Sequence, residues 1–163
     1  MKKLLLGLSL FYSVLVIGQY SEFKITNDGY SKYVVEEIKG KLKEEIYSKV
    51  LDWALITYKN PDRVITVKKE NEYIRINADN FGNTYIIEIA VKDEKYKITL
   101  ISFDAHSSGM TVSLMDVPNM LNKKGDVKWI YSGHKNNIAY LNNLNVELKD
   151  YILNGVSVSK KEW

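Results

Sequence analysis

The spacing of apolar residues along the chain alternates between the two periods that distinguish helices from strands. Tyr33–Val35 is a run of β-favouring residues followed by Gly40, which predicts a strand. From Lys41 apolar residues recur at steps of three and four, which predicts an amphipathic helix. Asn60-Pro61 ends it, because proline disfavours the α conformation of the residue before it. The predicted apolar face consists of Leu42, Ile46, Tyr47, Val50, Leu51, Trp53, Ala54, Thr57 and Tyr58.

Beyond Pro61 the apolar period falls to two, as in strands with one buried face. Ile74, Ile76 and Ala78, for example, alternate with polar or amphipathic residues. Polar turns of a few residues separate the successive runs, which predicts an antiparallel meander of four strands. We expect these strands at 64–67, 73–78, 85–92 and 96–100.

The last third of the chain changes character twice. Ala105–Gly125 is polar and predicts a long connection with at most one edge strand, and Val127–Tyr131 fits another short strand. From Lys135 the helical period returns and continues to Ile152, with Gly155 as a stop. The order β-α-β-β-β-β-α predicts an α+β domain, an antiparallel sheet of about five strands with two helices packed on one face. The polar lead-in at 19–31 adds a short strand near Phe23–Thr26.

The N-terminus has the pattern of an export signal. Lys2 and Lys3 precede fifteen uncharged residues, 4–18, which is shorter than the roughly 20 apolar residues of a spanning helix. We predict a signal peptide at 1–18, cleavage near Gly18 or Gln19, a single domain at 19–163, and a periplasmic or secreted location without a transmembrane span after cleavage. An uncleaved N-terminal anchor is the alternative.

Charge and composition then exclude several classes of protein. Cleavage after residue 18 removes two lysines, so the formal charge of the 163-residue chain falls from +3 to about +1. Only Arg63 and Arg75 are arginines, and the lysines are interleaved with acids, which argues against nucleic acid as a partner. The chain contains no cysteine, so no disulfide can support it.

Three segments resemble a known family. Glu45–Trp53, Tyr58–Ile65 and Val91–Thr99 together are similar to an uncharacterised secreted domain family of Bacteroidetes that has a TBP-like fold. The likeness covers roughly Tyr33–Phe103, and it departs from the family at Glu94, where Gly is favoured, and at Lys97, where Arg is favoured. It implies a TBP-like fold and no particular activity.

The cluster most similar to a catalytic or metal site is Asp104 and His106, followed by Ser107 and Ser108. Asp104 and His106 would point to one face of a strand and could hold a metal or orient a base beside a serine. No G-x-S-x-G or H-E-x-x-H motif supports either role, and a metal would need a third ligand. A solvated strand end is the alternative. His134 or Asp116 could supply that third ligand only if the fold happened to bring one of them close.

The 105–132 connection offers two further candidates. Asp116, Asn119 and Asp126 could supply oxygen ligands, but they lack the regular spacing of a calcium loop. We therefore predict no metal and no cofactor. Three of the four methionines lie in this connection and could form an adaptable contact surface or fill gaps beneath the loop. These methionines are Met110, Met115 and Met120.

The face of the sheet turned away from the helices is the remaining candidate. If Ile74 and Ile76 meet the helices, their polar neighbours face outward as a binding platform or as a solvated surface without a role. The predicted binding residues are Tyr73, Arg75, Asn77, Lys97 and Thr99.

The function we predict is an exported, non-enzymatic binding or envelope-associated domain. It contacts a protein or small ligand, with a homodimer as one option, through this face and the 105–132 connection. The alternative is a small hydrolase or metal-dependent enzyme centred on Asp104 and His106. Convergence of these two side chains with a third polar group in a pocket would favour the enzyme.

Overall fold

A computed structural model describes residues 22–80, 82–107 and 110–155. The predicted signal peptide at 1–18, its cleavage site and the tail at 157–163 lie outside these ranges. The strands are β1 (Ile25–Thr26), β2 (Gly29–Tyr30), β3 (Tyr33–Glu37), β4 (Ile65–Lys69), β5 (Tyr73–Asn80), β6 (Asn83–Lys92), β7 (Lys95–Ser107) and β8 (Met110–Ser113). The helices are α1 (Lys43–Thr57), α2 (Pro61–Val64) and α3 (His134–Asn154), with a 3₁₀ turn at Trp129–Tyr131.

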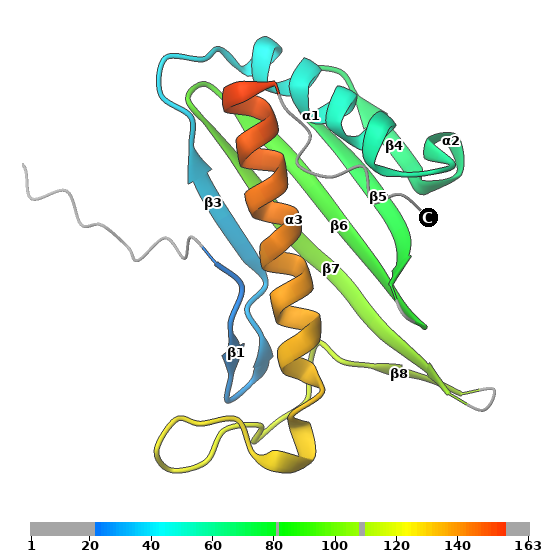
Figure 1. Ribbon diagram of the computed structural model, residues 1–163, viewed down its shortest axis with the longest axis vertical. Coiled ribbons are helices and arrows are strands. Elements are labelled where there is room, and N and C mark those ends of the chain that lie inside the picture. The colour runs from blue at the N-terminus through cyan, green and yellow to red at the C-terminus, as the bar shows by residue number, and fades with distance from the viewer. Residues whose placement is uncertain (1–21, 81, 108–109, 156–163) are drawn as a thin grey trace, which may run out of the picture.

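An antiparallel sheet forms the back of the molecule, in the order β3-β7-β6-β5-β4 with β8 also paired to β7 (Figure 1). Strand β7 has 13 residues, so two strands can pair along the same side of it: β3 pairs with Lys95–Thr99 and β8 with Asp104–Ser107. Strand β6 pairs along the other side of β7. The meander predicted from the alternating pattern is confirmed, and the sheet has six strands where about five were expected.

Helices α1 and α3 cover one face of this sheet (Figure 1). Each buries one stripe, and the stripes meet the inward residues of the strands, so the core lies between the two layers. Two members of the predicted apolar face of α1 are wrong. Leu42 precedes the helix as its N-cap and is exposed, and Thr57, the last residue of the helix, is also exposed. Gly155 ends α3 in the left-handed conformation, as predicted. The buried helix residues are Ile46, Tyr47, Val50, Trp53 and Ala54 of α1, and Leu141, Leu144, Asn145, Leu148 and Ile152 of α3.

Two predicted local structures differ from the fold. The short strand expected at Val127–Tyr131 is wrong, since Trp129–Tyr131 turns as a 3₁₀ helix. The Tyr131 and Ser132 amides donate locally, to the carbonyls of Lys128 and Trp129, and only Val127 forms a strand-like bridge, to Leu121. The turn after α1 also folds into the short helix α2, where Pro61 occupies the first turn.

The β1–β2 hairpin anchors the connection that follows β8. Gly29 has φ +114°, and a Cβ there would lie 1.9 Å from the carbonyl oxygen of Met115, so the backbones approach as only glycine allows. The Tyr30 amide donates to that carbonyl oxygen at 3.1 Å. Met115 and Met120 are buried and fill space under the connection, whereas Met110 on β8 is exposed.

Within the described ranges, no helix combines the length and hydropathy needed to cross a bilayer.

Candidate functional site

All five predicted binding residues lie on the sheet face opposite the helices, which we call the open face. Ile74 and Ile76 of β5 are buried toward the helices, as are Ile98 and Leu100 of β7, so the residues between them point the other way. Strand register arranges the open face in rows. One row runs Arg75, Glu88, Thr99 and Tyr33, the next runs Tyr73, Ala90 and Lys97, and Asn77 lies opposite Ile86.

Two pairs of a cation and an aromatic ring lie on this face. The Arg75 guanidinium lies 6.0 Å from the centre of the Tyr73 ring, and the Lys97 ammonium lies 6.0 Å from that of Tyr33. Arg75 also forms an ion pair with Glu88 at 2.7 Å. Sequence reasoning missed Tyr33, because the pairing of β3 with β7 is a long-range choice that the local pattern does not carry.

A bulge in the β6–β7 pairing reshapes the open face. The register shifts between Ile86 and Ile87, so Ser102 lies opposite Ile86 and Ile101 is exposed. The Ser102 hydroxyl and the Arg75 Nε are both shielded from solvent and have no hydrogen-bond partner among the described residues. A shielded polar group without a partner costs about 1–3 kcal/mol, so this face holds polar groups at the expense of stability.

His106 lies at one end of the same face, in a chain of hydrogen bonds that bypasses Asp104. Its Nε2 is 2.7 Å from the Thr84 hydroxyl, which is 2.8 Å from an Asp79 carboxylate oxygen, and its Nδ1 is 3.0 Å from the Thr111 hydroxyl. Thr84 has one proton and donates it to Asp79, so His106 Nε2 donates to Thr84. Asp104 lies opposite Thr84 in the register and forms no hydrogen bond with His106. Ser107 ends β7, and Ser108 lies outside the described residues.

The other candidate ligands are dispersed. His134 begins α3, where its Nδ1 lies 2.8 Å from the Tyr30 hydroxyl, and burial lowers the pKa of its imidazole. Asp126 accepts from the Asn122 side chain at 3.3 Å, and the Asn119 amide donates to the Asn27 carbonyl. In the part of the chain that the structure describes, no three His, Asp or Glu side chains are close enough to share a metal ion.

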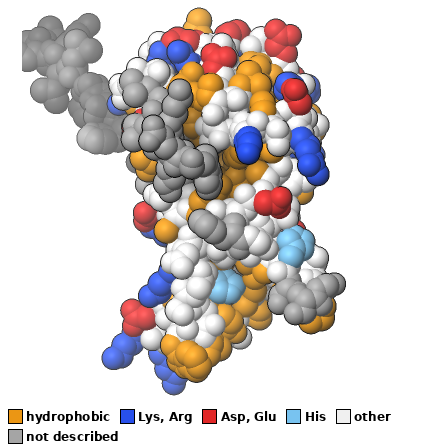
Figure 2. Space-filling model, turned by 45° about the vertical axis from the view of Figure 1, so that its right-hand side comes forward, with side chains coloured by type: hydrophobic (Ala, Val, Ile, Leu, Met, Phe, Trp, Pro, Cys, Tyr) orange, Lys and Arg blue, Asp and Glu red, His pale blue; other side chains and the backbone are white. Residues whose placement is uncertain are grey.

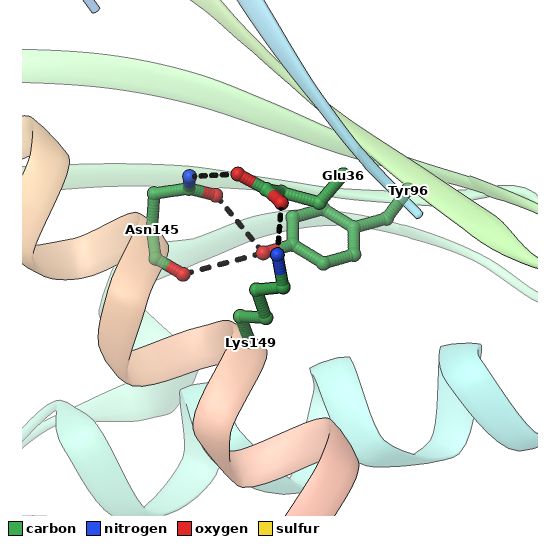
Figure 3. A network of polar contacts seen from close by, with 4 residues as sticks. All are labelled: Glu36, Tyr96, Asn145 and Lys149. Carbon is green, nitrogen blue, oxygen red and sulfur yellow. Dashed lines mark hydrogen bonds and ion pairs between the residues drawn. The ribbon is translucent and has the colours of Figure 1, made fainter. Parts of the chain in front are cut away.

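A polar network on the helix side of the sheet was not predicted (Figure 3). Glu36 is only 6% exposed, and its carboxylate accepts from the Asn145 amide at 2.9 Å and from the Lys149 ammonium at 2.5 Å. The Tyr96 hydroxyl donates to Asn145 Oδ1 at 2.9 Å, and burial raises the pKa of that hydroxyl. Glu36 and Tyr96 are directly opposite on β3 and β7. The network therefore joins α3 to one edge of the sheet.

A second buried group consists of three tyrosine hydroxyls. Tyr85 of β6 lies 3.0 Å from the Tyr58 hydroxyl and 2.8 Å from that of Tyr140, oxygen to oxygen. Burial raises the pKa of all three, so they stay protonated at physiological pH and act as hydrogen-bonding groups of the core.

Comparison with known proteins identifies the fold. No protein-family model matches the chain, and no curated protein matches it in sequence. Two solved structures are similar: a DUF4468 family protein from Bacteroides ovatus and a TBP-like protein from Parabacteroides distasonis. The first has a TM-score of 0.61 at 11% identity, covering 84% of this chain and 93% of that one. The second has a TM-score of 0.51 at 17% identity, covering 75% and 91%.

These likenesses confirm the TBP-like fold that the resemblance implied. Both neighbours come from Bacteroidetes, the group to which the resembled family belongs, and one is placed in a domain family of unknown function. At such low identity the likeness is one of fold, so the function must be argued from the residues of this chain.

Proposed function

We propose that this protein is an exported, non-enzymatic binding domain whose open face contacts a partner in the cell envelope. The observation that carries the proposal is the arrangement of five polar and aromatic residues on one sheet face, which no helix of the described ranges covers (Figure 1). The two cation–aromatic pairs hold Arg75 and Lys97 on opposite sides of β6, with Glu88 and Ala90 between them. A sheet face with charged and aromatic groups in fixed positions is suited to recognition.

Two further features support binding at this face. Tyrosine and arginine are the residue types that dominate binding energy at protein interfaces, and here they lie next to each other on β5. The unpartnered Ser102 hydroxyl and Arg75 Nε would gain hydrogen bonds if a partner's polar groups reached them after a small side-chain movement. Both features belong to the open face.

An enzyme centred on Asp104 and His106 is the second candidate. The chain from Asp79 through Thr84 to His106 does join a carboxylate, a hydroxyl and an imidazole. However, Thr84 donates its proton to Asp79, so the imidazole is not the acceptor that would activate this hydroxyl as a nucleophile. His106 is also exposed. The binding domain is therefore the function that the geometry supports better.

Site-specific crosslinking in the native envelope tests the proposal. A photoreactive amino acid replaces Asn77 on the open face or, as the matched control, the exposed Thr57 at the end of α1. We expect a discrete adduct, either with another protein or with a second copy, from position 77 only. Tyr73→Ala combined with Arg75→Gln should abolish that adduct, whereas Lys39→Gln, a similar loss of charge away from the face, should not. Equal adducts from both positions, or an adduct that survives the double substitution, would refute the proposal.

A further inference from the structure

The segment between β8 and α3 forms one extreme end of the molecule, the lower end in Figure 1. We call residues 121–135 the tip. Trp129 is 84% exposed and the adjacent Ile130 is 56% exposed, although large apolar side chains of this kind are usually covered. In Figure 2 hydrophobic side chains gather at this end of the molecule, with Lys or Arg side chains beside them. The tip therefore presents an apolar point at the end of the long axis.

The exposed pair is held in place by the fold of the tip. Asn122 Oδ1 accepts from the amides of Lys124 and Asp126 at 2.8 and 3.0 Å, which closes a tight turn. The Lys128 amide donates to the carbonyl of Met120, a fully buried residue, at 2.9 Å. The 3₁₀ turn then leads directly into α3. Trp129 and Ile130 are thus presented by a hydrogen-bonded structure that is anchored in the core.

The charge around the pair is positive. The tip contains four lysines and one aspartate: Lys123, Lys124, Lys128, Lys135 and Asp126. No ion pair with another described residue involves any of these four ammonium groups. This concentration of positive charge contrasts with a chain that carries a formal charge of only +3.

We propose that the tip is a membrane contact that inserts Trp129 and Ile130 into the interface of an anionic lipid bilayer. Tryptophan prefers the boundary between headgroups and acyl chains, where its ring is apolar and its N–H remains hydrated. The flanking lysines would stay at headgroup level and attract anionic lipids. Two apolar side chains are too small an area for a stable protein interface, but they match the shallow insertion of a peripheral protein.

This inference goes beyond the proposed function, because the tip and the open face are separate surfaces. Attachment through one end of the long axis would leave the open face free for a partner. The two proposals can therefore fail independently: loss of lipid binding says nothing about the crosslink at Asn77, and the reverse also holds.

Vesicle binding tests the inference. The chain from Gln19 onward keeps the whole core, which lies between Phe23 and Ile152. It also omits residues 1–18, the predicted signal peptide, whose apolar run would itself bind lipid. Trp163→Phe removes a tryptophan outside the described residues, and Trp53 is buried, so the fluorescence change reports on Trp129. The probes are vesicles of phosphatidylcholine with or without about 30% phosphatidylglycerol, an anionic lipid content close to that of biological membranes. Binding is measured at low and at high salt.

We expect a blue shift of the Trp129 emission and cosedimentation with anionic vesicles only, both weakened by salt. Trp129→Ser and, separately, Lys123→Gln with Lys124→Gln should each lower vesicle affinity by on the order of tenfold. The matched controls are Val146→Ser, an exposed apolar residue of α3, and Lys39→Gln with Lys59→Gln; both should bind as the parent does.

Four results would overturn the inference. The first is the absence of binding to anionic vesicles at low salt. The second is unchanged binding after Trp129→Ser in a variant whose circular dichroism matches that of the parent. The third is binding to a polyanion such as a homopolymeric RNA without binding to vesicles, which would make the lysines a general anion-binding patch. A loss of binding in the Val146→Ser control would likewise count against the tip as the contact.

Discussion

The two faces of the same sheet hold polar groups under opposite conditions. On the helix side, Glu36 is nearly fully buried and receives hydrogen bonds from both Asn145 and Lys149. On the open face, Arg75 and Glu88 form a single ion pair in which both side chains remain partly exposed. The register places Arg75 opposite Glu88 on β5 and β6, whereas the partners of Glu36 come from helix α3.

The contrast shows where polar residues contribute to stability and where they are available for binding. A buried charge is tolerated only when other groups satisfy it, so changes at Glu36 or its partners should be felt by the whole fold. An exposed ion pair gains little over its hydration, so Arg75 can be replaced at small cost to the fold and is free to serve recognition. Substitutions on the two faces should therefore change the free energy of unfolding by different amounts, even when the residues are adjacent in the sequence.

Substitutions of two adjacent residues of β5 should give the largest difference in stability between the two faces. Ile76 is fully buried against the helices, so Ile76→Ala should lower the free energy of unfolding by about 2–5 kcal/mol. Its neighbour Asn77 is exposed on the open face, so Asn77→Ala should change it by less than about 0.5 kcal/mol. Urea denaturation followed by circular dichroism measures both. A comparable loss at Asn77 would mean that the open face is covered in solution.

The buried polar network should give the next largest effect. Asn145→Leu removes the amide donor to Glu36 and the side-chain acceptor of the Tyr96 hydroxyl, which should cost about 2–3 kcal/mol. If the groups act together, Tyr96→Phe should cost less in the Asn145→Leu background than in the parent chain. Strict additivity in this double-mutant cycle would show that the network is not coupled. Arg75→Gln on the open face is the matched polar control and should cost much less.

Much of this fold could be predicted from local patterns. The alternation of Ile74, Ile76 and Ala78 indicated which face of β5 is buried, and the same parity placed Tyr73, Arg75 and Asn77 on the open face. The helical stripe likewise predicted the buried side of α3 up to Gly155. These features follow from the spacing of apolar residues within one helix or strand, and that spacing is visible in a single sequence.

Features that depend on pairing between distant elements could not be predicted. Tyr33 joins the open face only because β3 pairs with the first part of β7, more than 60 positions away. Buried Glu36 has the sequence context of a surface acid, and only the packing of α3 brings Asn145 and Lys149 to it. The segment at Val127–Tyr131 has a strand-like alternation, but it lacks a neighbouring strand along its length and turns as a 3₁₀ helix instead.

The two histidines permit the finest comparison, because His134 lies against the core and His106 lies on the open face. Burial lowers the pKa of His134, and its Nδ1 accepts from Tyr30, whose hydroxyl stays protonated because burial raises its pKa to about 12. In the unfolded chain a histidine titrates near pH 6.5, so below that value the unfolded state binds a proton that the folded state resists. Stability from this site is thus complete above about pH 6.5 and declines as the pH falls toward the lower pKa of the folded state.

Urea midpoints between pH 7.5 and 5 test this difference. His134→Gln cannot take up the proton, so its stability should fall less steeply over this range than that of the parent. His106→Gln keeps His134 and should retain the parental slope, which makes it the matched control for loss of a histidine. Equal slopes in the parent and His134→Gln would contradict a depressed pKa at His134. If the slope of stability against pH became shallower in His106→Gln instead, the acid sensitivity would lie on the open face. The open face would then contribute to stability, contrary to the contrast drawn between the two faces.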